Sequence, residues 1–213
     1  TGLLEFILKN VNAFPKKVQK SAVWTLSNFC RGKPFPDWDR VSKVLPVLKQ
    51  ILDETKDYDM IADILWAVSF LSEDRGDTED GTKIQIDGII QCGVLNNIIA
   101  IIKQTQKIKD ELQPKLGQSK LSKSEYLVGP CVHIIGNIVS GTDEHTAEVL
   151  KAGFYEIIET CLDQSARNTR KEACWALSNV LVGGNNQLEP FLNNQKLIKF
   201  RFVLLMNHVV FIP

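Results

Sequence analysis

The sequence predicts an all-α solenoid of stacked helical repeats. Three observations lead to this prediction: one short motif recurs at a fixed period, the apolar residues around each copy follow helical spacing, and 44% of the 213 residues are apolar. The 25 basic residues balance the 25 acidic ones, so no overall positive field exists to hold a phosphate backbone. We therefore expect a folded protein with no direct nucleic-acid partner.

The recurring motif has four copies, which begin at Trp24 (WTLSN), Trp66 (WAVSF), His133 (HIIGN) and Trp175 (WALSN). The first two of these anchor residues are 42 residues apart, and so are the last two. The middle pair is 67 residues apart, which is one period plus an insertion of about 25 residues. A period of this length built only from helices is typical of armadillo or HEAT units, each of which needs its neighbours to cover its apolar faces.

Each anchor lies in a predicted helix that has one apolar stripe. The stripe combines the positions two before, two after and five after the anchor, which lie on one side of a helix. Its members are Ala22, Leu26, Phe29, Ile64, Val68, Leu71, Cys131, Ile135, Ile138, Ala173, Leu177 and Val180. The anchor lies roughly 140 to 160° from this stripe. We therefore expect the tryptophan and histidine side chains to point away from the core of their own helices.

Further apolar helices are expected between the anchor helices, at residues 44–52, 94–102 and 154–162. Gly93 and Gly153 stand where a short first helix would turn into the longer second one. Glycines also stand eight positions after three of the anchors, where we expect a left-handed helix stop. These are Gly32, Gly141 and Gly183.

A small residue three positions after each anchor is expected to admit a neighbouring helix; these residues are Ser27, Ser69, Gly136 and Ser178. The insertion, at about residues 104–126, contains single lysines among polar residues. We expect it to be a solvated excursion from one repeat. An alternative is that this basic segment folds back and competes for the binding groove.

The five cysteines are odd in number and form no C-x-x-C pair, so buried free thiols in a reducing compartment are expected. The sequence contains no nucleophile elbow, phosphate loop, metal-ligand spacing or carboxylate pair. These observations predict a protein that is not an enzyme and that uses no metal and no cofactor.

The chain is expected to divide into about four repeats over residues 1–194, the first incomplete, and a divergent or truncated helical tail over 195–213. It begins at Thr1 with an apolar segment that lacks the flanks of a signal peptide. Arg201, Asn207 and His208 interrupt the apolar run near the other end, which falls short of the about 18 to 20 residues of a membrane span. We expect a piece of a longer protein with no membrane segment.

The segments WTLSNFCRGKPFPDW, DILWAVSFLSE, IIGNIVSGTDE and KEACWALSNV resemble helices of the importin-α family, and the resemblance runs from about Gln19 to Leu192. In that family an aromatic residue replaces the motif Asn in one middle repeat, and Arg replaces Trp in the next. Phe70 and His133 occupy these two places here, and His133 departs from the family's arginine.

The resemblance implies an armadillo-repeat right-handed superhelical solenoid that acts as a nuclear import adaptor and shuttles between cytoplasm and nucleus. Its implied partners are cargo proteins with Lys/Arg-rich nuclear localisation signals, bound in extended conformation. A further implied partner is importin-β, bound through a basic N-terminal segment that this sequence lacks.

The candidate peptide-binding site follows from helical geometry, which places the residues three before, at and four after each anchor within about 60° of arc. The faces comprise Ser21, Trp24, Asn28; Asp63, Trp66, Phe70; Pro130, His133, Asn137; and Glu172, Trp175, Asn179. Slots between successive tryptophans would sandwich the stems of Lys or Arg, each contact contributing about 0.5 to 2 kcal/mol. The Asn amides would hold the ligand backbone, and Asp63 and Glu172 would select for positive charge.

The resemblance adds Val139, Ser140, Asp143 and Thr146 to this site, and Arg31 is either a groove liner or a surface charge. The bland alternative for the three asparagines is that they brace neighbouring repeats. The rival function is another armadillo or HEAT scaffold of the β-catenin kind, whose grooves typically bind acidic partners through a basic face. The face predicted here contains Asp63 and Glu172 and no lysine.

Overall fold

The computed structural model describes residues 2–76, 79–111 and 118–182, and all its regular elements within these ranges are helices. In chain order they are α1 (Gly2–Asn10), the 3-10 turn η1 (Val11–Ala13), α2 (Lys16–Cys30), α3 (Trp38–Val41), α4 (Val44–Glu54), α5 (Tyr58–Ser72), α6 (Glu79–Gln91), α7 (Val94–Glu111), α8 (Gln118–Val139), α9 (Asp143–Ala152), α10 (Phe154–Leu162) and α11 (Arg167–Val182). The predicted all-α fold class is confirmed.

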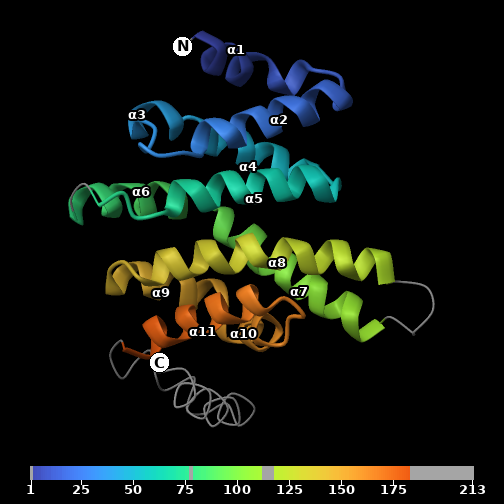
Figure 1. Cartoon of the computed structure of the whole chain (residues 1–213), viewed down its shortest axis with the longest axis vertical. Coiled ribbons are helices and arrows are strands. Elements are labelled where there is room, and N and C mark those ends of the chain that lie inside the picture. The colour runs from blue at the N-terminus through green and yellow to red at the C-terminus, as the bar shows by residue number, and fades with distance from the viewer. Residues whose placement is uncertain (1, 77–78, 112–117, 183–213) are drawn as a thin grey trace.

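The helices form units of three, in which a first helix leads into a second and then into an anchor helix. These units are α3 to α5, α6 to α8 and α9 to α11, and the pair α1 and α2 precedes them. The anchor helices α2, α5, α8 and α11 pack in succession as one layer, and α4, α7 and α10 form a second layer behind it (Figure 1). The result is a two-layer helical stack.

The predicted apolar stripe lies in the core of this stack. Every member is buried except Phe29, which is half-buried and packs against the core. Buried side chains of all the units join in one continuous hydrophobic cluster, so each unit covers the apolar face of the next. The assignment of the buried face from helical spacing is therefore confirmed.

Glycines with positive φ separate the helices at three of the predicted places. Gly93 (φ 78°) divides α6 from α7, Gly153 (φ 108°) divides α9 from α10, and Gly32 (φ 130°) follows α2. The prediction is wrong for Gly141, which does not have a positive φ. A Cβ atom there would come within 2.5 Å of the His145 ring, so a close side-chain approach requires this glycine. Gly183 lies outside the described residues.

The insertion is not a solvated excursion, and that expectation is wrong. The second helix α7 continues to Glu111 and α8 begins at Gln118, so most of the insertion lengthens two packed helices. The Thr105 and Ser124 hydroxyl oxygens lie 2.5 Å apart in a buried contact between these helices. Thr105 and Ile108 extend the buried face of α7 by helical spacing, which the abundance of lysine in this segment obscured.

All five cysteines are free thiols; Cys30, Cys131 and Cys161 are buried, and Cys92 and Cys174 are half-buried. Over the described ranges, no group of three or more His, Cys, Asp or Glu side chains is placed to hold a metal ion. No single described helix has the length and apolar composition of a membrane span, although the bent pair 81–91 and 94–111 reaches them jointly. The expected tail, residues 195–213, lies outside the described residues.

Candidate functional site

The four anchor residues line one side of the helical layer formed by α2, α5, α8 and α11. Trp24 is 58% exposed and Trp175 is 39% exposed, while Trp66 and His133 are half-buried. Because the stripe on the opposite side of each helix is buried, these rings point away from the core of their own helices. That geometric prediction is confirmed, and the side of the layer that carries the anchors is called the inner groove below.

The first part of the groove, between α2 and α5, is lined by aromatic rings and a cation. The Trp66 and Phe70 rings stack with centroids 6.0 Å apart and planes 27° from parallel. The Arg31 guanidinium, just after the end of α2, lies 5.7 Å from the centroid of Phe70. The Arg31 guanidinium therefore links the end of α2 to Phe70 of α5.

The last part of the groove, between α8 and α11, is built around the Trp175 indole. A Cβ atom on Gly136 would lie 2.5 Å from Cζ3 of Trp175 and 2.7 Å from its Cε3, so the ring rests directly on the bare backbone of α8. The small residue in this copy of the motif thus admits the indole of the next repeat. Beside it, Glu172 Oε2 lies 3.3 Å from His133 Nδ1.

The three motif asparagines differ in what their amides contact. Asn28 Nδ2 donates to the Trp24 carbonyl within its own helix at 2.8 Å, and Asn137 Nδ2 donates to Ser72 Oγ of α5 at 2.8 Å. Asn179 Nδ2 is buried and has no hydrogen-bond partner in the described part of the chain. Asn137 therefore braces neighbouring repeats, whereas Asn179 retains a donor beside Trp175.

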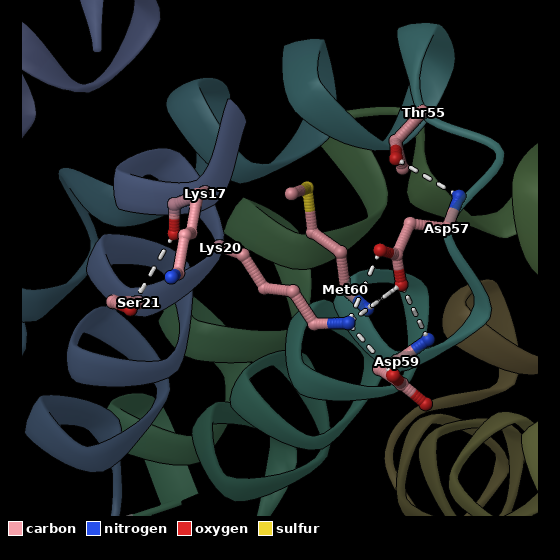
Figure 2. Close-up of polar contacts among 7 residues, drawn as sticks. All are labelled: Lys17, Lys20, Ser21, Thr55, Asp57, Asp59 and Met60. Carbon is pink, nitrogen blue, oxygen red and sulfur yellow. Dashed lines mark hydrogen bonds and ion pairs between the residues drawn. The ribbon is translucent and has the colours of Figure 1, made fainter. Parts of the chain in front are cut away.

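In the first part of the groove, two acidic side chains of α5 contact Lys20 of α2, which the helical spacing alone did not single out. Lys20 Nζ lies 2.7 Å from Asp59 Oδ2 and 3.1 Å from both carboxylate oxygens of Asp57 (Figure 2). Burial raises the pKa of the half-buried Asp63, and the Lys20 ammonium acts in the opposite direction. The prediction that the groove face contains no lysine is wrong, because Lys20 precedes Trp24 by four residues and shares its face.

The residues added by resemblance divide into two exposed and two buried positions. Ser140 and Asp143 are exposed near the junction of α8 and α9. Val139 and Thr146 are each only 4% exposed, and the Thr146 hydroxyl donates to the Thr142 carbonyl at 3.3 Å. Val139 and Thr146 therefore support the end of the groove from behind and do not present side chains to a ligand. Ser21 is exposed, and its hydroxyl donates to the Lys17 carbonyl at 3.5 Å.

Comparison with curated proteins shows one consistent group of relatives. The chain is 30% identical to importin subunit alpha-1a of Oryza sativa subsp. japonica over 194 residues, which is 90% of this chain and 32% of that protein. It is 31% identical to importin subunit alpha-3 of Arabidopsis thaliana over 176 residues, which is 82% of this chain and 28% of that protein. The chain is related to the importin-α subunits. This importin-α relative spans about a third of the length of the curated proteins that it matches, and no protein-family model matches it.

Solved structures place the importin-α relative in the armadillo fold. A designed armadillo repeat protein in complex with the peptide (KR)4 matches 93% of this chain and 78% of its own, with a TM-score of 0.64 and 20% identity. Computationally designed armadillo repeat proteins for modular peptide recognition match 92% of this chain and 78% of their own, with a TM-score of 0.66 and 18% identity. The predicted armadillo-repeat solenoid is therefore confirmed.

Proposed function

We propose that this importin-α relative is a nuclear import adaptor that binds Lys/Arg-rich nuclear localisation peptides, in extended conformation, along its inner groove. The similarity to importin-α subunits and to armadillo repeat proteins supports either a nuclear import adaptor or an armadillo peptide-binding scaffold. One observation favours a basic peptide as the ligand. At the α8–α11 end of the groove, Trp175, Glu172 and Asn179 lie together on one face of α11.

Each of these three side chains supplies what an extended basic peptide needs. The exposed Trp175 face packs on the aliphatic stem of a Lys or Arg, a contact that contributes about 0.5 to 2 kcal/mol. The Glu172 carboxylate attracts the charged end of that side chain. The Asn179 amide donates to a carbonyl of the peptide backbone, which satisfies a buried donor that has no partner in the described structure.

The proposal extends to partners and location in the cell. Proteins that carry such peptides are the proposed cargo, and importin-β is the proposed transport partner. An adaptor with these partners works in both the cytoplasm and the nucleus. The proposed role is binding, without catalysis of a reaction.

A titration with a fluorescent ten-residue Lys/Arg-rich peptide tests the proposal. We expect saturable binding to the full chain that weakens as salt rises, because partly exposed charge pairs are screened within about 8 Å at 0.15 M ionic strength. A peptide of the same length with Glu in place of the basic residues is the control. Equal binding of both peptides, or no binding of the basic peptide at low salt, would refute the proposed function.

A further inference from the structure

Helix α8 carries an imidazole, His133, at the place where the other anchor helices carry the indoles of Trp24, Trp66 and Trp175. His133 Nδ1 lies 3.3 Å from Glu172 Oε2, so this pair joins α8 to α11 on the groove side of the layer. The two side chains are 30% and 37% exposed, which leaves both within reach of a ligand in the inner groove. A ligand cation that approaches the Glu172 carboxylate therefore also approaches the imidazole.

The net charge of the pair formed by His133 and Glu172 depends on pH. Histidine is the side chain that ordinarily changes its charge between about pH 5 and pH 8, a range in which glutamate is ionised. A neutral imidazole can donate one hydrogen bond to the carboxylate but leaves the negative charge of the pair uncompensated. A protonated imidazole cancels that charge. The arginine found at this place in importin-α would cancel it at every pH in this range.

Two further charged side chains lie on the groove side of the helices next to His133. Asp63 of α5 is half-buried and lies on the same face as Trp66, and Lys171 of α11 is exposed and directly precedes Glu172. Over the described ranges, neither one forms an ion pair with His133 or with Glu172. Burial raises the pKa of Asp63, so this carboxylate is a second group on the groove side that takes up a proton as the pH falls. A test must separate the two.

The other two helices that pack against α8 are α7 and α9. α7 lies behind the groove, where Lys103 and Lys109 form ion pairs with acids of α10 and of the turn that follows it. α9 begins beyond the end of α8 with the acids Asp143 and Glu144, about three helical turns from His133 along the chain. In the part of the chain that the structure describes, the ion pair of His133 is therefore with Glu172.

We infer that His133 makes the affinity of the inner groove for a basic peptide depend on pH, because its proton and a ligand cation compete for the Glu172 carboxylate. At about pH 7.5 the neutral imidazole leaves the negative charge to the ligand. At about pH 5.5 the protonated imidazole cancels that charge, so the peptide binds more weakly. This inference rests on the proposed function, since it concerns the regulation of the same groove.

The test measures the Kd of an arginine-rich peptide with blocked ends for the full chain at about pH 5.5 and about pH 7.5, at one ionic strength, because arginine keeps its charge over this range. We expect the unmodified chain to bind about threefold more weakly at the lower pH, the effect of one partly exposed charge pair. His133→Gln stays neutral and should lose most of this difference while keeping the tighter Kd. The matched variant His133→Arg stays charged and should bind weakly at both pH values.

The comparison between these proteins isolates His133 from the other groups that titrate. Asp63 is present in all of them, and so is His145, which is 2% exposed and pairs with Asp87 of α6. A change in Kd that comes from those groups therefore appears equally in each protein. Equal pH profiles for the unmodified chain and His133→Gln would overturn the inference, while binding of basic peptides by the unmodified chain stands.

A measurement on the unmodified chain keeps the test decisive if a His133 variant folds poorly by circular dichroism. Because the proton and the peptide compete, linkage requires that binding at about pH 6.5 releases protons. Isothermal titration calorimetry in two buffers of different ionisation enthalpy measures this release. Binding without proton release, or with proton uptake, contradicts the competition. Failure of the unmodified chain to bind the peptide at either pH instead refutes the proposed function.

Discussion

At the scale of single residues, the groove depends on how the Trp175 indole is seated. Its ring lies against Gly136, where any side chain would collide with Cζ3 and Cε3. The recurrence of small residues three positions after each anchor predicted a close approach, but the identity of the approaching group required the structure. The Trp175 indole of the next repeat fills this space. One side of the ring is covered by the α8 backbone, and the other side faces the groove.

Gly136→Ala is expected to weaken binding of a Lys/Arg-rich peptide by roughly 2- to 30-fold, the equivalent of one cation-π slot. The new methyl group forces the partly exposed indole to turn, while alanine stabilises the helix by up to about 1 kcal/mol relative to glycine. We therefore expect little change in melting temperature. The Kd from fluorescence anisotropy and a thermal melt measure the two quantities.

Gly129→Ala is the matched control, since it makes the same change in the same helix with only an ordinary contact of 3.5 Å to Thr169 Oγ1. Its affinity for the peptide should match that of the unmodified chain. Unchanged affinity in Gly136→Ala would show that the position of the Trp175 ring does not control binding.

Helical spacing identified the anchor side chains of the groove face but not Lys20, which lies at the edge of that face. Spacing identified Trp24, Trp66 and Trp175 as outward-facing, because their offset from the apolar stripe is regular. Lys20 also lies on the groove face, one turn before Trp24 and next to Ser21. Whether a lysine meets an acid of the next helix depends on the stacking of α2 against α5, which sequence spacing within one helix does not contain.

At the scale of helices, the first turn of α5 depends on Asp57, which caps two backbone N–H groups and contacts Lys20. Asp57→Ala should lower the free energy of unfolding by about 1 kcal/mol, since alanine cannot cap. The melting temperature should fall by about 2 to 4 °C for a chain of this size. Asp57→Asn keeps the cap and should lose less. Equal losses would show that the ion pair with Lys20, and not the cap, accounts for the effect.

The same carboxylate predicts a dependence of stability on pH. Burial acts to raise the pKa of Asp57, but hydrogen bonds from the Met60 backbone and from Lys20 outweigh it and hold the pKa below the ordinary 3.8. A group with a depressed pKa in the folded state stabilises the protein above its unfolded-state pKa and loses this contribution as pH falls. The stability difference between the unmodified chain and Asp57→Ala, from urea unfolding, should therefore shrink from pH 6 to pH 3. A difference that stayed constant would contradict this account.

Helix boundaries were predictable where apolar spacing and glycine agreed, as at Gly93 and Gly153. The insertion was not, because its composition suggested a loop while Thr105 and Ile108 kept the buried spacing of α7. Composition averages over all faces of a helix, whereas burial depends on one face. The packing of the lengthened α7 against the lengthened α8 is visible only in the three-dimensional structure. Thr105 of α7 and Ser124 of α8, which are 19 residues apart in the sequence, make this contact.

At the scale of the whole molecule, one hydrophobic cluster runs through every unit of the stack. The period of 42 residues predicted this arrangement, because repeats of this kind bury their faces only against their neighbours. The order of the motif variants, including Phe70 and His133, predicted the kinship with importin-α. Neither could predict that Lys20 of α2 forms ion pairs with Asp57 and Asp59 of α5.

The continuity of the core predicts how the thiols react. Burial raises the pKa of Cys30 to about 12, and it raises the pKa of Cys131 and of Cys161 well above the ordinary value of 9.0. These three cysteines should therefore resist an aromatic disulfide reagent at pH 8 until urea unfolds the chain, while the half-buried Cys92 and Cys174 react earlier. Reaction of all five at one fast rate in the native protein would contradict the burial of the stack.

The most direct test of the groove is the indole N–H region of a two-dimensional NMR spectrum of the full chain, recorded as a Lys/Arg-rich peptide is added. The chain has four tryptophans, and Trp38 serves as an internal control because it packs against Gly88 of α6 and under the Arg75 guanidinium, away from the anchor faces. Single Trp→Phe variants assign the four signals. We predict that the Trp175 signal shifts most and that the Trp38 signal stays in place. A Trp175 signal that does not move while the peptide binds, or a shift of Trp38 alone, would contradict it.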